Sequence, residues 1–181
     1  MEIAYVSGLF GDLRDAARPV RMVGARHEHV RAYFFRGVVD AVVVGRDHHA
    51  EEYSGGERAA IDVLTSIASR RGVKPCALLG DMLELGEYSR LMHDQLGQYA
   101  AQMKVQKLYC YGAMADVVAE AAIKKGVRAD NVYVSLDSDN PTEMAKMINS
   151  SMQSGDVLLV KASRAVSAER VIEALTKIRK K

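Results

Sequence analysis

The chain has 181 residues, with 25 Lys or Arg against 23 Asp or Glu, so it suits a single domain with a sizeable core and a formal net charge of only +2. Basic residues cluster only at Lys177, Arg179, Lys180 and Lys181, which is typical of a charged helix end and predicts no nucleic-acid partner. No apolar run reaches the roughly 18 residues that span a membrane, and residues 1–6 do not read as a signal peptide, so we expect no membrane partner.

Residues 1–37 show no regular period, which predicts a linker-like segment whose packing the sequence does not define. From residue 38 onward, strand and helix periods alternate. The predicted strands are 38–44, 76–79, 107–111, 132–135 and 157–160, and the predicted helices are 57–70, 88–103, 113–125, 141–152 and 167–178. We therefore expect residues 38–181 to form an α/β, Rossmann-like domain with a mostly parallel sheet of about five to six strands and helices on both faces.

Two helix ends are marked by their residues. Pro141 suits a first helical turn, with Asn140 or Asp139 as its cap. Gly126 suits the end of the preceding helix.

A functional site is predicted where the strand at 76–79 ends. The apolar run stops at Gly80-Asp81, and Met82-Leu83-Glu84-Leu85-Gly86 follows before the next helix. Open α/β sheets bind ligands beyond the carboxyl ends of their strands, so Asp81 is the first candidate. A turn closed by a capping Asp is the simpler alternative, and it stays open.

A second candidate group follows the strand at 157–160. It consists of Lys161, Ser163 and Arg164, with Ala162 between them. Cations and a hydroxyl beside a helix N-terminus suit phosphate or carboxylate ligands, although solvated surface charge is the simpler alternative. In a parallel sheet this group and Asp81 share one edge, and Leu79 and Leu159 lie on adjacent or nearly adjacent strands.

Together the two segments resemble the C-terminal domain of the Mur ligases, most closely the MurF type that adds D-alanyl-D-alanine to a UDP-N-acetylmuramoyl tripeptide. That family carries Leu-Gly-Asp-Met-x-Glu-Leu-Gly, which residues 79–86 match completely. It also carries Gly-Asp-x-x-Leu-x-Lys-Gly-Ser-Arg and a later Glu, which residues 155–164 and Glu169 match except at Ala162. Alanine there would tighten the loop if the position needs a positive φ.

The resemblance weakens upstream. Residues 58–64 look like the helix that follows the family's Tyr-Asn-Ala-Asn-Pro loop, and residues 19–22 look like its linker. Residues 47–56 occupy the place of that loop without its sequence.

The resemblance implies that Asp81 contacts the nucleotide ribose, and that Lys161, Ser163 and Arg164 face a phosphate or the incoming dipeptide carboxylate. It implies ATP and Mg²⁺ for the complete enzyme, with a central ATP-binding domain, UDP-muramoyl peptide and D-alanyl-D-alanine as partners. Residues 1–181 contain no Gly-x-x-x-x-Gly-Lys-Ser/Thr loop to cradle ATP phosphates. We therefore expect no catalytic residue, no tightly bound cofactor and no ligation by this chain alone.

Metal and redox chemistry find little support in the sequence. Cys76 and Cys110 each lie in an apolar strand pattern, which predicts two reduced, buried thiols and a cytoplasmic location. Histidine pairs at 27 and 29 and at 48 and 49 lack further ligands at a recognised spacing, so we predict no metal site.

Two functions remain open. The first is a substrate-binding and lid domain of an ATP-dependent peptidoglycan-precursor ligase, which is favoured by a linker-like segment directly after Met1. The second is a diverged, non-catalytic Rossmann-like module that binds another ligand or itself, which is favoured by residues 47–56 and Ala162.

Overall fold

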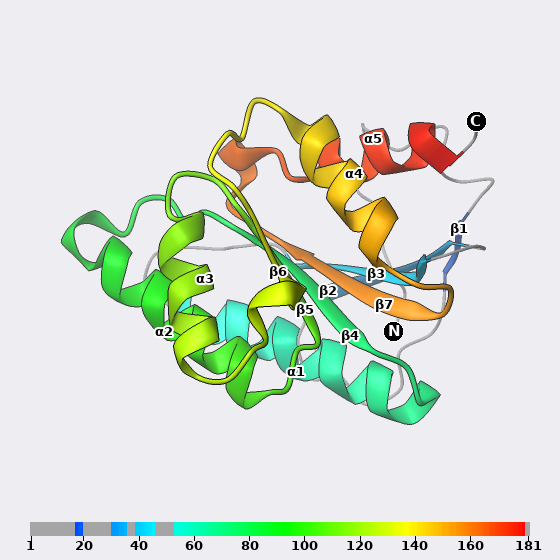
Figure 1. Ribbon diagram of the computed structural model, residues 1–181, viewed down its shortest axis with the longest axis horizontal. Coiled ribbons are helices and arrows are strands. Elements are labelled where there is room, and N and C mark those ends of the chain that lie inside the picture. The colour runs from blue at the N-terminus through cyan, green and yellow to red at the C-terminus, as the bar shows by residue number, and fades with distance from the viewer. Residues whose placement is uncertain (1–16, 20–29, 36–38, 46–52, 180–181) are drawn as a thin grey trace.

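A computed structural model of the chain describes residues 17–19, 30–35, 39–45 and 53–179. Seven strands form one sheet in the order β1-β2-β3-β7-β4-β5-β6 (Figure 1). The strands are β1 (Ala17–Pro19), β2 (Val30–Phe35), β3 (Val39–Gly45), β4 (Pro75–Gly80), β5 (Lys107–Tyr111), β6 (Val132–Ser135) and β7 (Asp156–Lys161). The helices are α1 (Tyr53–Arg71), α2 (Ser89–Gln102), α3 (Ala115–Lys124), α4 (Pro141–Ser151) and α5 (Glu169–Arg179), with short 3-10 helices η3 (Gly86–Tyr88), η4 (Ala129–Asn131) and η5 (Arg164–Val166).

The predicted Rossmann-like α/β fold is confirmed, because the pairs β3–β7, β7–β4, β4–β5 and β5–β6 are all parallel. At the β3 edge, β2 and β1 continue the sheet in antiparallel pairs. Both fall within residues 1–37, so the sheet has more strands than the sequence led us to expect. Arg31 interrupts the apolar residues of β2, and glycines and charged residues surround the strand in the sequence, so no regular period marks it. The rest of residues 1–37 lies outside the described chain.

Helices cover both faces of the sheet. Figure 1 shows α1, α2 and α3 on one face and α4 and α5 on the other. Neighbouring strand residues alternate between the two resulting cores, so that Leu79 and Leu159 pack on the α1–α3 side while Leu78 and Leu158 pack on the α4–α5 side. Burial on both sides explains the continuous apolar runs of β4 and β7. These two strands are direct neighbours, as expected for Leu79 and Leu159.

The predicted helix ends are also confirmed. The Asn140 side chain accepts a hydrogen bond from the Glu143 amide at 3.3 Å, and Pro141 occupies the first helical turn of α4. Gly126 follows the C-cap of α3 with a φ of +108°, a conformation that favours glycine. Lys177 and Arg179 occupy the last turn of α5, where cations complement the helix dipole.

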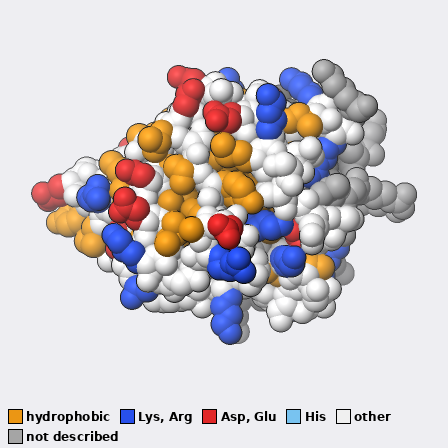
Figure 2. Space-filling view, viewed as in Figure 1, with side chains coloured by type: hydrophobic (Ala, Val, Ile, Leu, Met, Phe, Trp, Pro, Cys, Tyr) orange, Lys and Arg blue, Asp and Glu red, His pale blue; other side chains and the backbone are white. Residues whose placement is uncertain are grey.

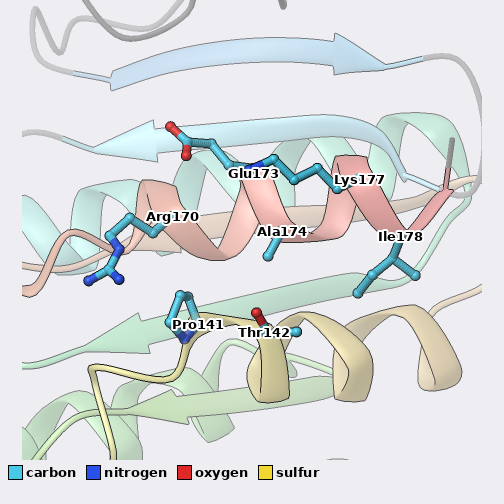
Figure 3. A pocket seen from close by; sticks show the side chains of 7 residues that line it. All are labelled: Pro141, Thr142, Arg170, Glu173, Ala174, Lys177 and Ile178. Atoms are coloured by element: carbon cyan, nitrogen blue, oxygen red, sulfur yellow. The ribbon is translucent and has the colours of Figure 1, made fainter.

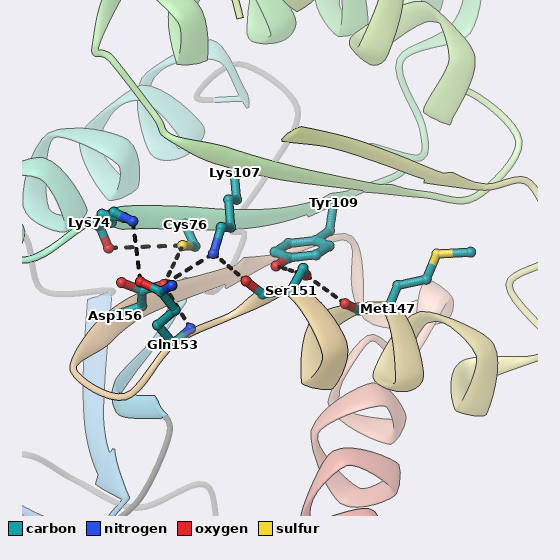
Figure 4. A network of polar contacts seen from close by, with 8 residues as sticks. All are labelled: Lys74, Cys76, Lys107, Tyr109, Met147, Ser151, Gln153 and Asp156. Carbon is teal, nitrogen blue, oxygen red and sulfur yellow. Dashed lines mark hydrogen bonds and ion pairs between the residues drawn. The ribbon is translucent and has the colours of Figure 1, made fainter. Parts of the chain in front are cut away.

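A buried polar network lies where β4, β5 and β7 begin, at the end of the sheet opposite Asp81 (Figure 4). The Asp156 carboxylate accepts from the Gln153 amide at 3.0 Å and pairs with the Lys107 ammonium at 3.4 Å. Lys107 also donates to the Ser151 carbonyl, and the Tyr109 hydroxyl lies 2.7 Å from the Ser151 hydroxyl. The network fastens the end of α4 to the sheet, which is a structural role.

Cys76 and Cys110 are free and buried, as predicted. Burial raises the pKa of the Cys76 thiol to about 12, and the nearby Asp156 carboxylate adds to this shift, so the thiol stays protonated and unreactive. Within the described ranges, no three His, Cys, Asp or Glu side chains gather as a metal site would require. The histidine pairs at 27 and 29 and at 48 and 49 lie outside these ranges. None of the described helices combines the length and apolarity that a membrane span needs.

Candidate functional site

The two segments singled out in the sequence meet at one edge of the sheet. Leu79 of β4 stands opposite Lys161 of β7 in the parallel register, so both chains leave the sheet at the same end. Beyond the strands, the Ser163 amide donates to the Asp81 carbonyl at 3.0 Å, and the Leu83 amide donates to the Ser163 hydroxyl at 2.9 Å. The expected convergence of the two segments is therefore confirmed.

The Asp81 carboxylate is 8% exposed and already has two backbone partners. Its Oδ2 accepts from the Ala113 amide at 2.8 Å, and its Oδ1 accepts from the Met114 amide at 2.9 Å. These amides lie just before α3, whose N-cap is Met114, and the dipole of that helix favours negative charge there. Asp81 thus has the capping role that the sequence left open, although it caps a distant helix. Each oxygen retains a second acceptor site for a ligand hydroxyl.

Gly112 makes this arrangement possible. Its φ is +118°, and a Cβ added there would lie only 2.5 Å from the Asp81 Cγ. The Gly112 amide donates to the Ser135 carbonyl at 2.9 Å, which ties the turn to the end of β6. A glycine is therefore required both by the backbone angle and by the closeness of the carboxylate.

Ala162, which replaces a family glycine, fits without backbone strain. It is not among the non-glycine residues with positive φ, so the expected tightening through φ does not occur. Its methyl group lies against Gly80 instead, where an added Cβ would approach to 2.6 Å. Ala162 therefore leaves no room for a side chain at position 80.

Lys161 lies inside the molecule, paired with Glu57 of α1. The ammonium is 3.0 Å from the Glu57 Oε1, and the side chains of Lys161 and Glu57 are 2% and 3% exposed. Burial raises the pKa of Glu57 to about 7 and lowers the pKa of Lys161 to about 8, since each loses its hydration. A backbone hydrogen bond at Glu57 opposes the rise in the pKa of this carboxyl group, and an ion pair favours the charged form of both partners. In this structure the Lys161 cation is engaged with a carboxylate of the same chain.

Ser163 is half-buried and its hydroxyl accepts from Leu83, so it shapes the loop after Asp81. Arg164 follows directly and begins η5, where the Val166 amide donates to the Ser163 carbonyl at 3.0 Å. The backbone thus places Arg164 at the same edge as Asp81.

Sequence reasoning missed Glu57 and His93. Glu57 lies early in α1, and its partner is in a strand far along the chain, so no local pattern connects them. His93 is fully buried in α2, and its Nε2 accepts from the Met82 amide at 2.9 Å. The sequence offers only a weak signal for it, because His93 stands one helical turn before Leu96 and Gly97 on the buried face of α2.

A shallow hollow on the α4–α5 face is separate from this site (Figure 3). Its volume is ≈390 Å³. It is lined by Pro141, Thr142, Arg170, Glu173, Ala174, Lys177 and Ile178. Glu173 lies between the two cations on α5, and none of the candidate residues from the sequence contributes to the lining.

Exposed apolar side chains flank the loop after Asp81. Leu83, Tyr88 and Leu91 are 40%, 57% and 50% exposed. Figure 2 shows apolar side chains near the narrow end of the molecule, where this loop enters α2, and across the middle of the same face. Exposed apolar groups gathered on one part of a surface are typical of a contact that a partner covers.

Comparison with known proteins gives a family match. The family described as "Mur ligase, glutamate ligase domain" matches residues 55–164. The UDP-N-acetylmuramoyl-tripeptide–D-alanyl-D-alanine ligase of Bacillus subtilis is 27% identical over 118 residues, which are 65% of this chain and 24% of the relative. The ligase of the same name from Synechocystis sp. is 30% identical over 125 residues, 69% of this chain and 26% of the relative. The chain thus spans about a quarter of these relatives' length.

Solved structures agree with this match. The MurF ligase from Thermotoga maritima in complex with ADP has a TM-score of 0.59 and 25% identity, covering 87% of this chain and 32% of its own. MurF from Acinetobacter baumannii has a TM-score of 0.57 and 20% identity over 75% of this chain and 28% of its own, which shows the shared fold.

Proposed function

This chain belongs to the Mur ligase, glutamate ligase domain family, and we propose that it is the C-terminal substrate-binding and lid domain of an ATP-dependent ligase that adds D-alanyl-D-alanine to a peptidoglycan precursor. The observation that carries the proposal is the contact between Asp81 and Ser163 at the ends of β4 and β7. Parallel α/β sheets bind ligands at such an edge. The names of the relatives support the substrate class, and the ADP complex of the Thermotoga maritima enzyme supports the nucleotide.

Each residue of the edge has a role in this proposal. The unused acceptor sites of Asp81 receive a ribose hydroxyl, while α3 holds the carboxylate in place. Ser163 and Arg164 bind a phosphate or the dipeptide carboxylate, since hydroxyl and guanidinium donors suit anions. Lys161 lies behind them and contributes a positive charge, which the Glu57 carboxylate partly neutralises.

ATP and Mg²⁺ belong to the complete enzyme in this proposal. The Asp81 edge fits the ribose part of a nucleotide, because a carboxylate with spare acceptor sites stands there. ATP supplies the free energy for amide bond formation when it is bound. A separate ATP-binding domain holds its phosphates, and Leu83, Tyr88 and Leu91 give that domain an apolar surface to close upon.

One observation favours the second candidate function, a non-catalytic module that binds another ligand or itself. Glu57 engages Lys161, whose charge the ligase proposal uses at the substrate edge. Residues 47–52 of the altered family loop lie outside the described chain and contribute nothing to the choice. Enzymatic complementation separates the two functions.

The first expected result is that the chain alone neither hydrolyses ATP nor forms an amide bond, because it lacks the loop that cradles ATP phosphates. Added to the separately expressed N-terminal and central portion of the Bacillus subtilis relative, it restores ATP-dependent formation of the pentapeptide product. The measurement is product formation with and without D-alanyl-D-alanine.

The matched control is the C-terminal domain of the same relative, supplied as a separate chain. If the control domain restored product formation and this chain did not, even at saturating concentration, the result would favour the non-catalytic module. If this chain alone released phosphate from ATP, and Asp81→Asn abolished that activity, the prediction that the chain cannot hydrolyse ATP by itself would be wrong.

The second expected result concerns direct binding. On titration with ADP, amide chemical shifts should change at residues 79–86, where the proposed ribose contact lies. Amide shifts of residues 161–165 should change with D-alanyl-D-alanine, and with the phosphates of ADP, since Ser163 and Arg164 are the proposed anion donors. Binding is expected to be weak, since one wall of the cleft belongs to another domain. Changes confined to the hollow between α4 and α5 would show that the nucleotide site has not been retained.

A further inference from the structure

A buried histidine of α2 lies against the loop that follows Asp81. The His93 Nδ1 is 2.7 Å from the Ser89 carbonyl, one helical turn earlier, and Nε2 is 2.9 Å from the Met82 amide. A carbonyl can only accept, so Nδ1 carries the proton and Nε2 is left as an unprotonated acceptor. These two partners assign one neutral tautomer to His93.

The loop over residues 81–86 is held from two directions. Ser163 forms hydrogen bonds with the Asp81 carbonyl and the Leu83 amide. His93 accepts a hydrogen bond from the Met82 amide, which lies between them. Farther along, Glu84 has a φ of +67° and Gly86 a φ of +54°. A non-glycine residue in this left-handed region costs free energy and persists only where its surroundings fix the backbone. The loop conformation therefore depends on contacts from outside the loop.

We propose that His93 is a positioning residue for the ligand-facing loop, acting through the Met82 amide rather than by touching the ligand. The amide follows Asp81 directly, so the imidazole fixes the backbone that carries the nucleotide-binding carboxylate. The proposal rests on the proposed function in taking a nucleotide as the ligand of Asp81. It is distinct from a packing role, in which only the volume of the imidazole matters.

Two substitutions separate positioning from packing. His93→Gln keeps a long side chain whose amide oxygen can accept from the Met82 N–H, whereas His93→Leu fills space without an acceptor. Gln98→Leu is the matched control, because Gln98 is on the same helix and, among the described residues, its side chain donates to Asp94 of that helix at 2.6 Å. The full chain is labelled for nuclear magnetic resonance, and three quantities are measured: imidazole nitrogen shifts, amide hydrogen exchange over residues 82–86, and the dissociation constant for ADP.

In the unsubstituted chain the nitrogen shifts should report the neutral Nδ1–H tautomer. In His93→Leu, exchange at Met82 and Leu83 should accelerate by about tenfold or more, as expected when a buried donor loses its acceptor. The ADP dissociation constant should rise by about five- to tenfold, which corresponds to the loss of one hydrogen bond. His93→Gln should recover most of both losses, and Gln98→Leu should change neither.

Several outcomes would overturn the proposal. An Nε2–H or charged imidazole in the unsubstituted chain would remove the acceptor, and this measurement stands even if His93→Leu fails to fold. Equal ADP binding by the Leu and Gln variants, alongside normal ADP shifts at residues 79–86, would show a packing role while leaving the proposed function intact. Absence of any ADP response in the unsubstituted chain would instead reject the nucleotide ligand, and the positioning role with it.

Discussion

Lys161→Met should destabilise the fold by about 3–5 kcal/mol, the usual cost of leaving one partner of a buried ion pair alone. Glu57 is 3% exposed in the unsubstituted chain, and the substitution removes its cation. Apart from a contact with its own backbone that lowers its pKa, the Glu57 carboxylate has no hydrogen bond among the described residues, so the ion pair is the main compensation for its lost hydration. The measurement is the free energy of unfolding from urea denaturation.

The effect of Lys161→Met should depend on pH with a definite sign. Burial raises the pKa of Glu57 from 4.5 to about 7, so between these values the folded protein binds a proton that the unfolded chain has released. Stability therefore falls as the pH rises through this window. Lys161 offsets that loss, so the substitution should have its smallest effect near pH 4.5 and its largest above pH 7.

Glu57→Met should give the opposite slope. Burial lowers the pKa of Lys161 from 10.5 to about 8, so between these values the unfolded chain holds a proton that the folded chain has lost. Stability of this variant should rise with pH in that window. The double variant, with Met at both positions, should recover most of the stability and lose both slopes, because a well-packed apolar pair replaces an ion pair at little cost.

Lys124→Met is the matched control. Lys124 lies 3.5 Å from Glu120, but the two side chains are 73% and 62% exposed. An exposed pair of this spacing contributes only about 0.3–0.5 kcal/mol. Equal losses for Lys161→Met and Lys124→Met would mean that the Glu57 pair is solvated in solution.

The sequence predicted the parallel part of the fold well because its signals are local. Each of β4, β5 and β7 is buried on both faces and is therefore a short, continuous apolar run. Helix ends at Asn140, Pro141 and Gly126 follow from residues that act within one turn. The antiparallel β2 combines Arg31 with an apolar run at 32–35, and nothing in its composition indicates the direction in which it pairs with β3.

The candidate site was predictable only in part for the same reason. Asp81 and Ser163 follow strand ends, and a parallel sheet brings strand ends together whatever their separation in sequence. The partners that complete the site come from helices: α3 supplies amides to Asp81, α2 supplies His93, and α1 supplies Glu57. Which side chain of a helix reaches the edge depends on how the helix packs, and a single sequence does not show it.

Gly112 affects both the stability of the fold and the position of the Asp81 carboxylate. An alanine there would have to adopt a φ near +118°, and its methyl carbon would overlap the Asp81 carboxylate at 2.5 Å. The backbone conformation costs about 1–3 kcal/mol. The overlap adds about 1–3 kcal/mol, since backbone or carboxylate must move and the bonds from Ala113 and Met114 are stretched.

Gly112→Ala is therefore expected to lose about 2–6 kcal/mol of unfolding free energy, the sum of the two costs, and to weaken ADP binding. Gly126→Ala isolates the first cost, because Gly126 has a φ of +108° and an added Cβ meets nothing within 4 Å. Combining Gly112→Ala with Asp81→Ala removes the overlap, so the double variant should lose less than the two single losses added together. If Gly112→Ala and Gly126→Ala lose the same free energy and the double variant is additive, the Asp81 carboxylate does not lie against Gly112, and the anchored nucleotide site argued from that contact is wrong.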